Sequence, residues 1–270
     1  MRSVISFVAV TLAAVSSMAA AAASVDPALI AAIADNQRTQ SFVARDAARH
    51  PAEELTFFGV KADSNVVELW PGGGYWTEIL APYLAAHGHY TAALPPTKDN
   101  GEDSATVAKW RSRVAAQGAR FGTVHETTLA SGQLDIAPPG SADFVLTFRN
   151  LHNWMQDNYA PAALAACFRA LKPGGILGIE DHRARNDQPQ DPQAKSGYVR
   201  QDYAINLAKQ AGFELVAASE IDANPKDTKD YPKGVWTLPP TLELGDQDRA
   251  KYVAIGEADN FVLKFRKPKH

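Results

Sequence analysis

Three short segments carry the residue types best suited to chemistry, and each follows a predicted strand. Residues 68–77 begin with an acid and contain a glycine triplet, residues 149–154 contain a histidine, and residues 180–183 contain an aspartate and a histidine. In an open parallel sheet, ligands bind beyond the carboxyl ends of the strands. We therefore expect these three segments to converge on one pocket.

The first segment predicts a turn that holds a nucleotide-like ligand. Residues 66–69 form an apolar run that includes Glu68, residues 72–74 are glycines, and an amphipathic helix is predicted over about 75–86. Glycines let backbone N–H groups approach a ligand closely, and the helix directs the positive end of its dipole to the same place. A glycine triplet alone is weak, so the strand before it and the helix after it carry much of this prediction.

The other two segments supply candidate acid and base groups. His152 and His182 are the candidate general bases, because imidazole exchanges protons near neutral pH. Asp181 points to the opposite face from His182 in regular strand geometry, so their adjacency predicts no charged pair. Their spacing together with His152 is not diagnostic of a metal site, and we expect no metal. The alternative is structural: the loop residues cap the next helix, and residues 181–183 anchor the loop that follows.

Strands and helices alternate along most of the chain, which predicts an α/β fold with a parallel sheet covered by helices on both faces. A helical preface is expected at residues 24–58, and residues 183–197 and 222–256 are predicted loops, the second a candidate lid. The predicted strands are 66–69, 90–94, 121–125, 143–148, 175–180, 213–220 and 260–266, and the predicted helices of the sheet are 75–86, 103–117, 159–171 and 201–211.

The N-terminus and the composition of the chain predict its location, its domain size and the kinds of partner it binds. Residues 1–23 combine a cationic start, an apolar stretch and small residues, which predicts a signal peptide and an exported protein, periplasmic or secreted, without stable membrane insertion after cleavage. About 245 residues then remain, enough for one large domain. A net charge of −3 with scattered cations predicts no nucleic-acid partner. The single cysteine, Cys167, lies in an apolar helical run and is expected to be a buried, inert thiol.

Four segments together resemble the class I S-adenosylmethionine-dependent methyltransferases, whose Rossmann-like fold has a seven-stranded, mostly parallel sheet. They are the acid and glycine turn at 68–74, the strand and loop at 142–154, the Leu-Lys-Pro-Gly-Gly turn at 171–175, and the pair 210–215 and 261–265, which resembles the family's final antiparallel strands. The resemblance runs from about residue 45 to 268 and is nearest to a bacterial branch of predicted methyltransferases with leader peptides. It implies a methyltransferase-like domain at 59–270, after the signal peptide and the helical extension.

The resemblance also implies a cofactor and roles for the site residues. The cofactor would be S-adenosylmethionine, and the acceptor would be a small molecule or a protein that the sequence does not identify. Methyl transfer needs in-line positioning and, for a protonated nucleophile, proton removal. His152, Asp181 and His182 are therefore expected near the acceptor. The expected cofactor contacts are Glu68, Gly72, Gly73, Gly74, Tyr75, Asn150 and Trp154.

Two positions depart from the family pattern. Trp70 stands where the first glycine is usual, so we expect Pro71 and the indole to hold the turn. Leu94 stands where an acid usually receives both ribose hydroxyls; each lost charge-assisted hydrogen bond is worth roughly 1.5–3 kcal/mol. A leader would also carry the chain away from the cytosol, where S-adenosylmethionine is made. The alternative is thus an exported methyltransferase-like protein without activity that binds another small ligand.

Two other enzyme classes fit less well. A nucleophilic hydrolase of the elbow type is excluded because the sequence contains no Gly-x-Ser-x-Gly. A dehydrogenase is a closer competitor, because Gly72-x-Gly74-x-x-Thr77 approaches a dinucleotide fingerprint. The acid at Glu68, the missing ribose acid and the predicted terminal hairpin argue against it.

Overall fold

The computed structural model describes residues 25–98, 101 and 103–269, so the predicted signal peptide lies outside the described residues. Within them, seven strands form a sheet in the order β3-β2-β1-β4-β5-β7-β6. This arrangement confirms the predicted α/β fold and places β1 and β4 at the centre. The strands are β1 (Asn65–Leu69), β2 (His89–Leu94), β3 (Val124–Thr128), β4 (Ala142–Phe148), β5 (Leu171–His182), β6 (Glu214–Ser219) and β7 (Asn260–Arg266).

Strand direction follows the expected pattern. β1 pairs in parallel with β2 and β4, β2 with β3, and β4 with β5. β7 lies between β5 and β6 and is antiparallel to both, which confirms the antiparallel end of the sheet. The carboxyl ends of β1, β4 and β5 therefore lie side by side at the same end of the sheet, as the convergence of the three polar segments requires.

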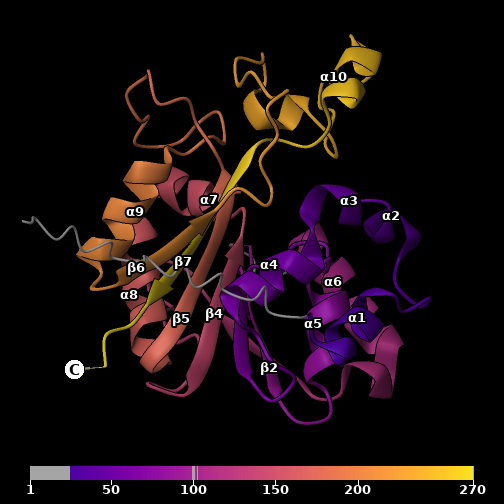
Figure 1. Ribbon diagram of the computed structural model, residues 1–270, viewed down its shortest axis with the longest axis vertical. Helices are drawn as coiled ribbons and strands as arrows, with labels where there is room; N and C mark the ends of the chain where they lie inside the picture. Colours follow the sequence, from indigo (N-terminus) through magenta and orange to yellow (C-terminus); the bar gives the residue numbers. More distant parts are fainter. Residues whose placement is uncertain (1–24, 99–100, 102, 270) are drawn as a thin grey trace, which may run out of the picture.

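Helices cover both faces of the sheet (Figure 1). α7, α8 and α9 lie on one face, and α1, α4, α5 and α6 lie on the other. The helices before the sheet are α1 (Pro27–Ile33), α2 (Gln40–Val43), α3 (Asp46–Arg49) and α4 (Pro51–Phe58). The later ones are α5 (Thr77–Leu84), α6 (Ala105–Gln117), η1 (Gly118–Phe121), α7 (Leu151–Gln156), α8 (Ala160–Ala170), α9 (Gln201–Gln210), η2 (Gly234–Thr237) and α10 (Arg249–Ile255).

Two apolar cores hold these layers to the sheet. One packs Val145, Leu164 and Phe213 under α7, α8 and α9, and the other packs Phe58 and Ile79 under the preface and α5. Burial of apolar side chains at this scale is the main force that stabilises the fold. Cys167 lies in the first core, which confirms that its thiol is buried, and burial raises its pKa to about 12.

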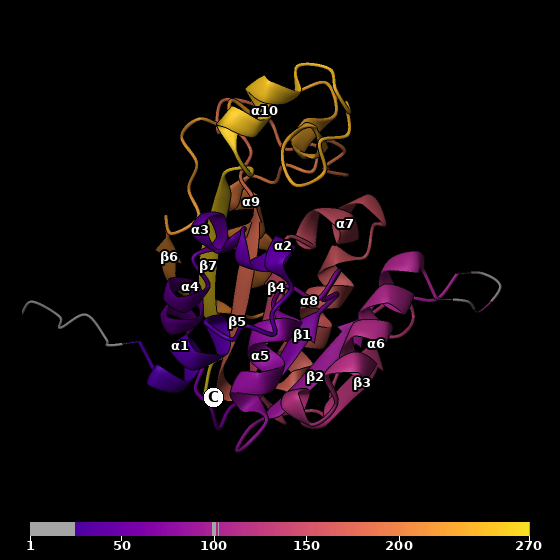
Figure 2. The same ribbon diagram turned by 90° about the vertical axis from the view of Figure 1, so that its right-hand side faces the viewer.

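Four elements differ from the sequence prediction. β5, expected at 175–180 after a turn at 171–175, runs from Leu171 to His182. The strand expected at 121–125 begins at Val124, because η1 occupies the residues up to Phe121. α7 was not predicted, since its six residues are too few to show helical periodicity. The segment 222–256 contains η2 and α10 and lies beyond the carboxyl ends of the strands, at the top of Figure 2. No helix of the described residues has the length and apolar character needed to cross a membrane.

Candidate active site

One cavity of about 320 Å³ lies at the carboxyl ends of the central strands. Its walls come from the glycine turn, the loop after β4, the helical preface and the segment 222–256. Seven of the expected site residues line it: Glu68, Gly72, Gly73, Tyr75, Asn150, His152 and His182. The other three, Gly74, Trp154 and Asp181, do not reach the cavity wall. The three polar segments thus converge on one pocket, as expected.

The glycine turn is shaped by its tryptophan. Trp70 adopts a φ of 48°, and its indole N–H donates to the carbonyl of Leu129 at 2.9 Å. This bond confirms the expectation that an indole holds the turn in place of the usual glycine. Gly74 has a φ of 95°, and a Cβ there would meet Arg113 at 3.1 Å and Trp110 at 3.2 Å. The missing side chain of Gly74 therefore lets the turn pack closely against α6, whereas Gly72 and Gly73 line the cavity.

Glu68 forms the buried floor of the turn. Its carboxyl accepts hydrogen bonds from the hydroxyls of Tyr90 and Thr77, the latter at 3.3 Å. The indole of Trp110 donates to the Thr77 hydroxyl at 2.9 Å, which joins α6 to the same network. Burial raises the pKa of Glu68 to about 7, although both hydroxyl donors act in the opposite direction. Glu68 is therefore a carboxyl whose charge responds to its ligand and to pH near neutrality.

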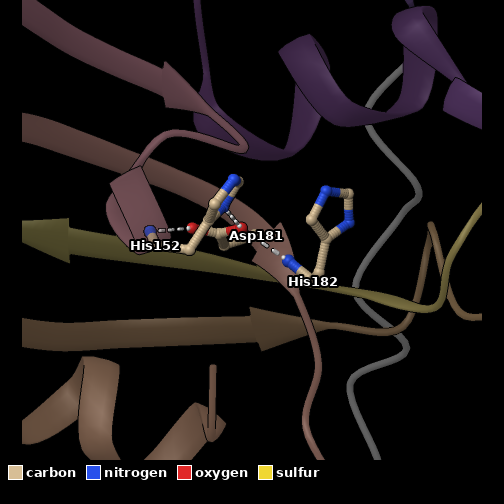
Figure 3. Close-up of side chains that lie close together, drawn as sticks. All are labelled: His152, Asp181 and His182. Carbon is tan, nitrogen blue, oxygen red and sulfur yellow. Dashed lines mark hydrogen bonds and ion pairs between the residues drawn. The ribbon is translucent and has the colours of Figure 1, made fainter. Parts of the chain in front are cut away.

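His152 and Asp181 form a buried pair across two elements (Figure 3). His152 Nδ1 lies 2.9 Å from Asp181 Oδ1, and the backbone N–H of His152 donates to Oδ2 at 3.0 Å. Burial by itself would raise the pKa of Asp181, but the attraction of His152 and its hydrogen bond bring that pKa below its usual value. A carboxylate at Nδ1 fixes the tautomer and leaves Nε2 free to accept a proton.

His182 is held by a separate chain of hydrogen bonds. Its Nδ1 lies 2.7 Å from Asn260 Oδ1, and the amide nitrogen of Asn260 donates to Glu180 at 2.7 Å. Burial lowers the pKa of His182 to about 3, so its ring is neutral at physiological pH. The rings of His152 and His182 lie 5.4 Å apart, and both border the cavity (Figure 3). Asp181 thus pairs with His152 through its side chain and with His182 only through the backbone N–H.

The remaining expected residues support the site from within the protein. Asn150 donates from its amide to the carbonyl of Leu69 at 2.9 Å, which ties the loop after β4 to the end of β1. Trp154 is fully buried and lies edge-on to Trp70, with ring centroids 6.3 Å apart. It therefore packs behind the glycine turn, on the side away from the cavity.

Several cavity residues were not predicted from the sequence. The main ones are Phe42, Arg45, Arg49, Trp236 and Glu257. The preface and the segment after β6 carry no sequence motif. Their residues were therefore recognised as cavity residues only because the structure packs both segments against the strand ends. Arg149 also lines the cavity, and its place beside His152 in the predicted loop was the available signal.

The residues present fit one half of S-adenosylmethionine better than the other. The glycine turn offers backbone N–H groups and the carboxyl of Glu68 to an amino-acid moiety, and both border the cavity. At the ribose position, Leu94 ends β2 inside an apolar cluster with an exposed fraction of 3%. The family's ribose carboxylate is therefore absent, and no described residue at the end of β2 or β3 borders the cavity.

This sheet order, with a glycine turn after β1 and a ligand cavity at the strand ends, defines a class I methyltransferase fold. Residues 71–179 match the model of a family described as a methyltransferase domain. Over these residues the chain is similar to a methyltransferase domain. No curated protein sequence matches the chain.

Solved structures share the fold at low sequence identity. A methyltransferase from Aquifex aeolicus, described as dependent on S-adenosylmethionine, aligns with a TM-score of 0.55 at 16% identity, over 83% of this chain and 93% of that one. An arsenic(III) S-adenosylmethionine methyltransferase from Chlamydomonas reinhardtii aligns at 0.51 and 18% identity, over 90% and 74%. The [4+2]-cyclase SpnF aligns at 0.56 and 16% identity, over 87% and 85%. At these identities the likeness establishes the fold alone, and the cyclase shows that one fold carries more than one chemistry.

Proposed function

We propose that the protein transfers the methyl group of S-adenosylmethionine to a small acceptor, and that His152 removes the acceptor's proton. The observation that carries this proposal is the shared cavity, in which the glycine turn and Glu68 face the same space as a histidine held by a buried carboxylate. When bound, the cofactor supplies a methyl group that is already electrophilic. The protein then has to position the two reactants and accept a proton.

Each side chain has a defined task in this scheme. The backbone of Gly72 and Gly73 and the carboxyl of Glu68 hold the amino-acid part of the cofactor. His152 accepts the proton at Nε2, and Asp181 stabilises the positive charge that then develops on the ring. His182 stays neutral beside it and orients the acceptor by hydrogen bonding. The segment 222–256 covers the cavity through Trp236, whose ring centroid lies 6.0 Å from that of His152, and excludes water.

Titration calorimetry with S-adenosylhomocysteine tests the cofactor assignment. A Cβ at Gly72 meets no atom within 4 Å, and Gly72 lines the cavity, so Gly72→Val should fill the ligand space and abolish binding. Gly132→Val is the matched control, because Gly132 also has a positive φ and open space but lies away from the cavity. We expect saturable binding to the wild type and to the control. The absence of binding to the wild type at millimolar ligand would remove the enzyme assignment.

A second candidate function is supported by the apolar ribose position. Leu94 and the restriction of the cavity to the β1, β4 and β5 side favour a smaller ligand than a complete nucleoside. In that case the chain is a methyltransferase-like protein that binds another small molecule. The same calorimetry separates the two functions, since this candidate predicts no response to S-adenosylhomocysteine.

We also propose that the protein is exported. The support is the leader-like sequence of residues 1–23, with Arg2 before an apolar stretch and alanines at its end. Cell fractionation followed by N-terminal sequencing tests this proposal. We expect a mature protein outside the cytosol that begins near residue 24, and an intact N-terminus in the cytosolic fraction would contradict it.

A further inference from the structure

Three arginines in the cavity wall converge on one carboxylate. Arg45 binds Glu257 through two hydrogen bonds, from Nε to Oε1 at 2.6 Å and from Nη2 to Oε2 at 2.7 Å. Arg149 donates from Nη1 to Glu257 Oε2 at 3.0 Å, and Arg49 Nε lies 3.5 Å from the same oxygen. All four side chains line the cavity. Three positive charges therefore share a single negative partner.

Arg49 lacks hydrogen-bond partners although it is buried. Its side chain is 2% exposed, and neither Nε nor Nη2 has a hydrogen-bond partner among the described residues. The face of its guanidinium is covered by Tyr75, with 4.3 Å between the guanidinium carbon and the ring centroid. Buried N–H groups without hydrogen-bond acceptors are costly, even with the carboxylate of Glu257 at 3.5 Å, and native proteins leave few of them. The cavity that Arg49 lines is the remaining place from which an acceptor can come.

The neighbouring acids do not balance this charge. Glu180 lies 3.9 Å from Arg149 Nε, but burial raises its pKa to about 8, which makes it a weaker counter-charge than an ordinary carboxylate. Burial also raises the pKa of Glu54 well above its usual value, and Asp222 pairs with His50 at 2.9 Å. Glu257 alone stays firmly ionised, because its arginine partners outweigh the effect of burial on its pKa. This side of the cavity therefore carries excess positive charge.

We propose that Arg45, Arg49 and Arg149 bind a carboxylate or phosphate group of the methyl acceptor, so that the acceptor is an anionic small molecule. Guanidinium groups match the geometry of both anions and bind them more firmly than neutral groups. Arg149 lies in the loop after β4 and His152 in the first turn of α7, which follows that loop, so an anion held by Arg149 places the rest of the acceptor beside the base. The identity of the ligand as an acceptor rests on the proposed methyltransferase function, whereas the anion site itself does not.

Binding of simple anions to the purified protein tests the site. We expect malonate and inorganic phosphate to raise the thermal unfolding midpoint and to bind in calorimetry, whereas malonamide, a neutral analogue of malonate, should do neither. Arg49→Gln and Arg45→Gln should each weaken malonate binding about tenfold or more, and Arg49→Lys should restore part of it. The side chain of Arg45 is 18% exposed, so Arg45→Gln is less disruptive to folding than the same change at the buried Arg49.

A matched control and two outcomes decide the anion site. Arg120→Gln is the control, because Arg120 also has an unpartnered buried nitrogen but does not line the cavity. Its malonate affinity should equal that of the wild type. Equal responses to malonate and malonamide, or unchanged malonate affinity in both Arg49→Gln and Arg45→Gln, would overturn the site.

Calorimetry with S-adenosylhomocysteine separates the two sources of the anion. Unchanged affinity of Arg49→Gln for S-adenosylhomocysteine supports the acceptor. A loss of about tenfold or more assigns the arginines to the cofactor's own carboxylate and overturns the acceptor assignment. If the wild type binds malonate but not S-adenosylhomocysteine, the methyltransferase function fails, and the arginines remain an anion site whose ligand is no methyl acceptor.

Discussion

At the scale of single residues, the site depends on which partner orients each histidine. Asp181 is adjacent to His182 in sequence, yet its side chain bonds to His152, 29 residues away. Strand geometry correctly predicted that Asp181 and His182 would not pair through their side chains. The actual partner could not be predicted, because it depends on how α7 begins beside the end of β5.

The pair of His152 and Asp181 predicts a loss of turnover in Asp181→Asn. An amide at this position removes the charge that stabilises the protonated ring and permits the wrong tautomer, so we expect turnover to fall about 100-fold or more. Turnover is measured as the rate of S-adenosylhomocysteine release in the presence of an accepted substrate. The affinity of the variant for S-adenosylhomocysteine should stay unchanged. Asp143→Asn is the control, because Asp143 also binds a backbone N–H and a cation, but its partners Asn65 and Lys172 do not line the cavity as His152 does. Full activity of Asp181→Asn would exclude this role.

Glu68 predicts a pH dependence of stability. Burial raises its pKa from 4.5 to about 7, so the folded state holds the proton more tightly than the unfolded state does. Its contribution to stability is therefore complete below about pH 4.5 and is lost as pH rises through about 7. The free energy of unfolding of the wild type should fall between pH ~5 and ~8. In Glu68→Gln we expect this fall to be smaller by roughly 1–3 kcal/mol. Chemical denaturation at both pH values measures the free energy of unfolding, and Glu214→Gln, at an exposed position, is the control. Parallel pH profiles for wild type and Glu68→Gln would contradict the prediction.

At the scale of elements, the glycine turn has two different glycine requirements. Gly72 needs its positive φ and faces open space, whereas Gly74 also lies against the side chains of α6. Sequence alone indicated a ligand turn for both. It could not show that Gly74 serves packing, because the contact comes from Trp110 and Arg113, more than thirty residues later.

This difference predicts unequal costs of alanine at the two positions. Gly72→Ala should lower the free energy of unfolding by about 1 kcal/mol, the cost of a left-handed backbone for a residue with a Cβ. Gly74→Ala should lower it by roughly 2–4 kcal/mol, because the new methyl group also crowds the Trp110 and Arg113 side chains of α6. Urea unfolding of both variants gives the comparison. Equal costs would show that α6 does not press on the turn.

The elements themselves were largely predictable where they are long or strongly apolar. β1, β4 and the terminal β7 follow from their apolar patterns, and the antiparallel end of the sheet follows from the family resemblance. η1 and α7 were missed because each is too short to show a periodic pattern. The same limit hid the role of α3, which carries Arg49 into the cavity wall.

At the scale of the whole molecule, the cavity is closed by two parts of the chain that lie far apart in sequence. The helical preface contributes Phe42 and Arg49, and the segment 222–256 contributes Trp236. That segment packs with Tyr198 of the loop after β5 into a small apolar cluster, which also includes Leu238 and Tyr252. It is therefore a packed cap, whereas its proline-rich sequence predicted a loop and candidate lid.

The cap is attached at a close backbone contact, which predicts a local effect of Gly234→Ala. A Cβ at Gly234 would lie 2.1 Å from the carbonyl oxygen of Ser196, so the methyl group must push the cap away from the loop after β5. We expect faster amide hydrogen exchange in residues 222–256 and 183–200, with the central strands unchanged. Gly245→Ala, in the same segment but with open space around it, is the control. Uniform loss of protection across the sheet would contradict a separately attached cap.

We expect cofactor and base to meet in one cavity, and a crystal structure with bound S-adenosylhomocysteine measures this arrangement. The amino-acid part of the ligand should lie against Gly72, Gly73 and Glu68, with the sulfur facing the space in front of His152 Nε2. A ligand bound elsewhere, or bound here with its sulfur turned away from His152, would contradict it.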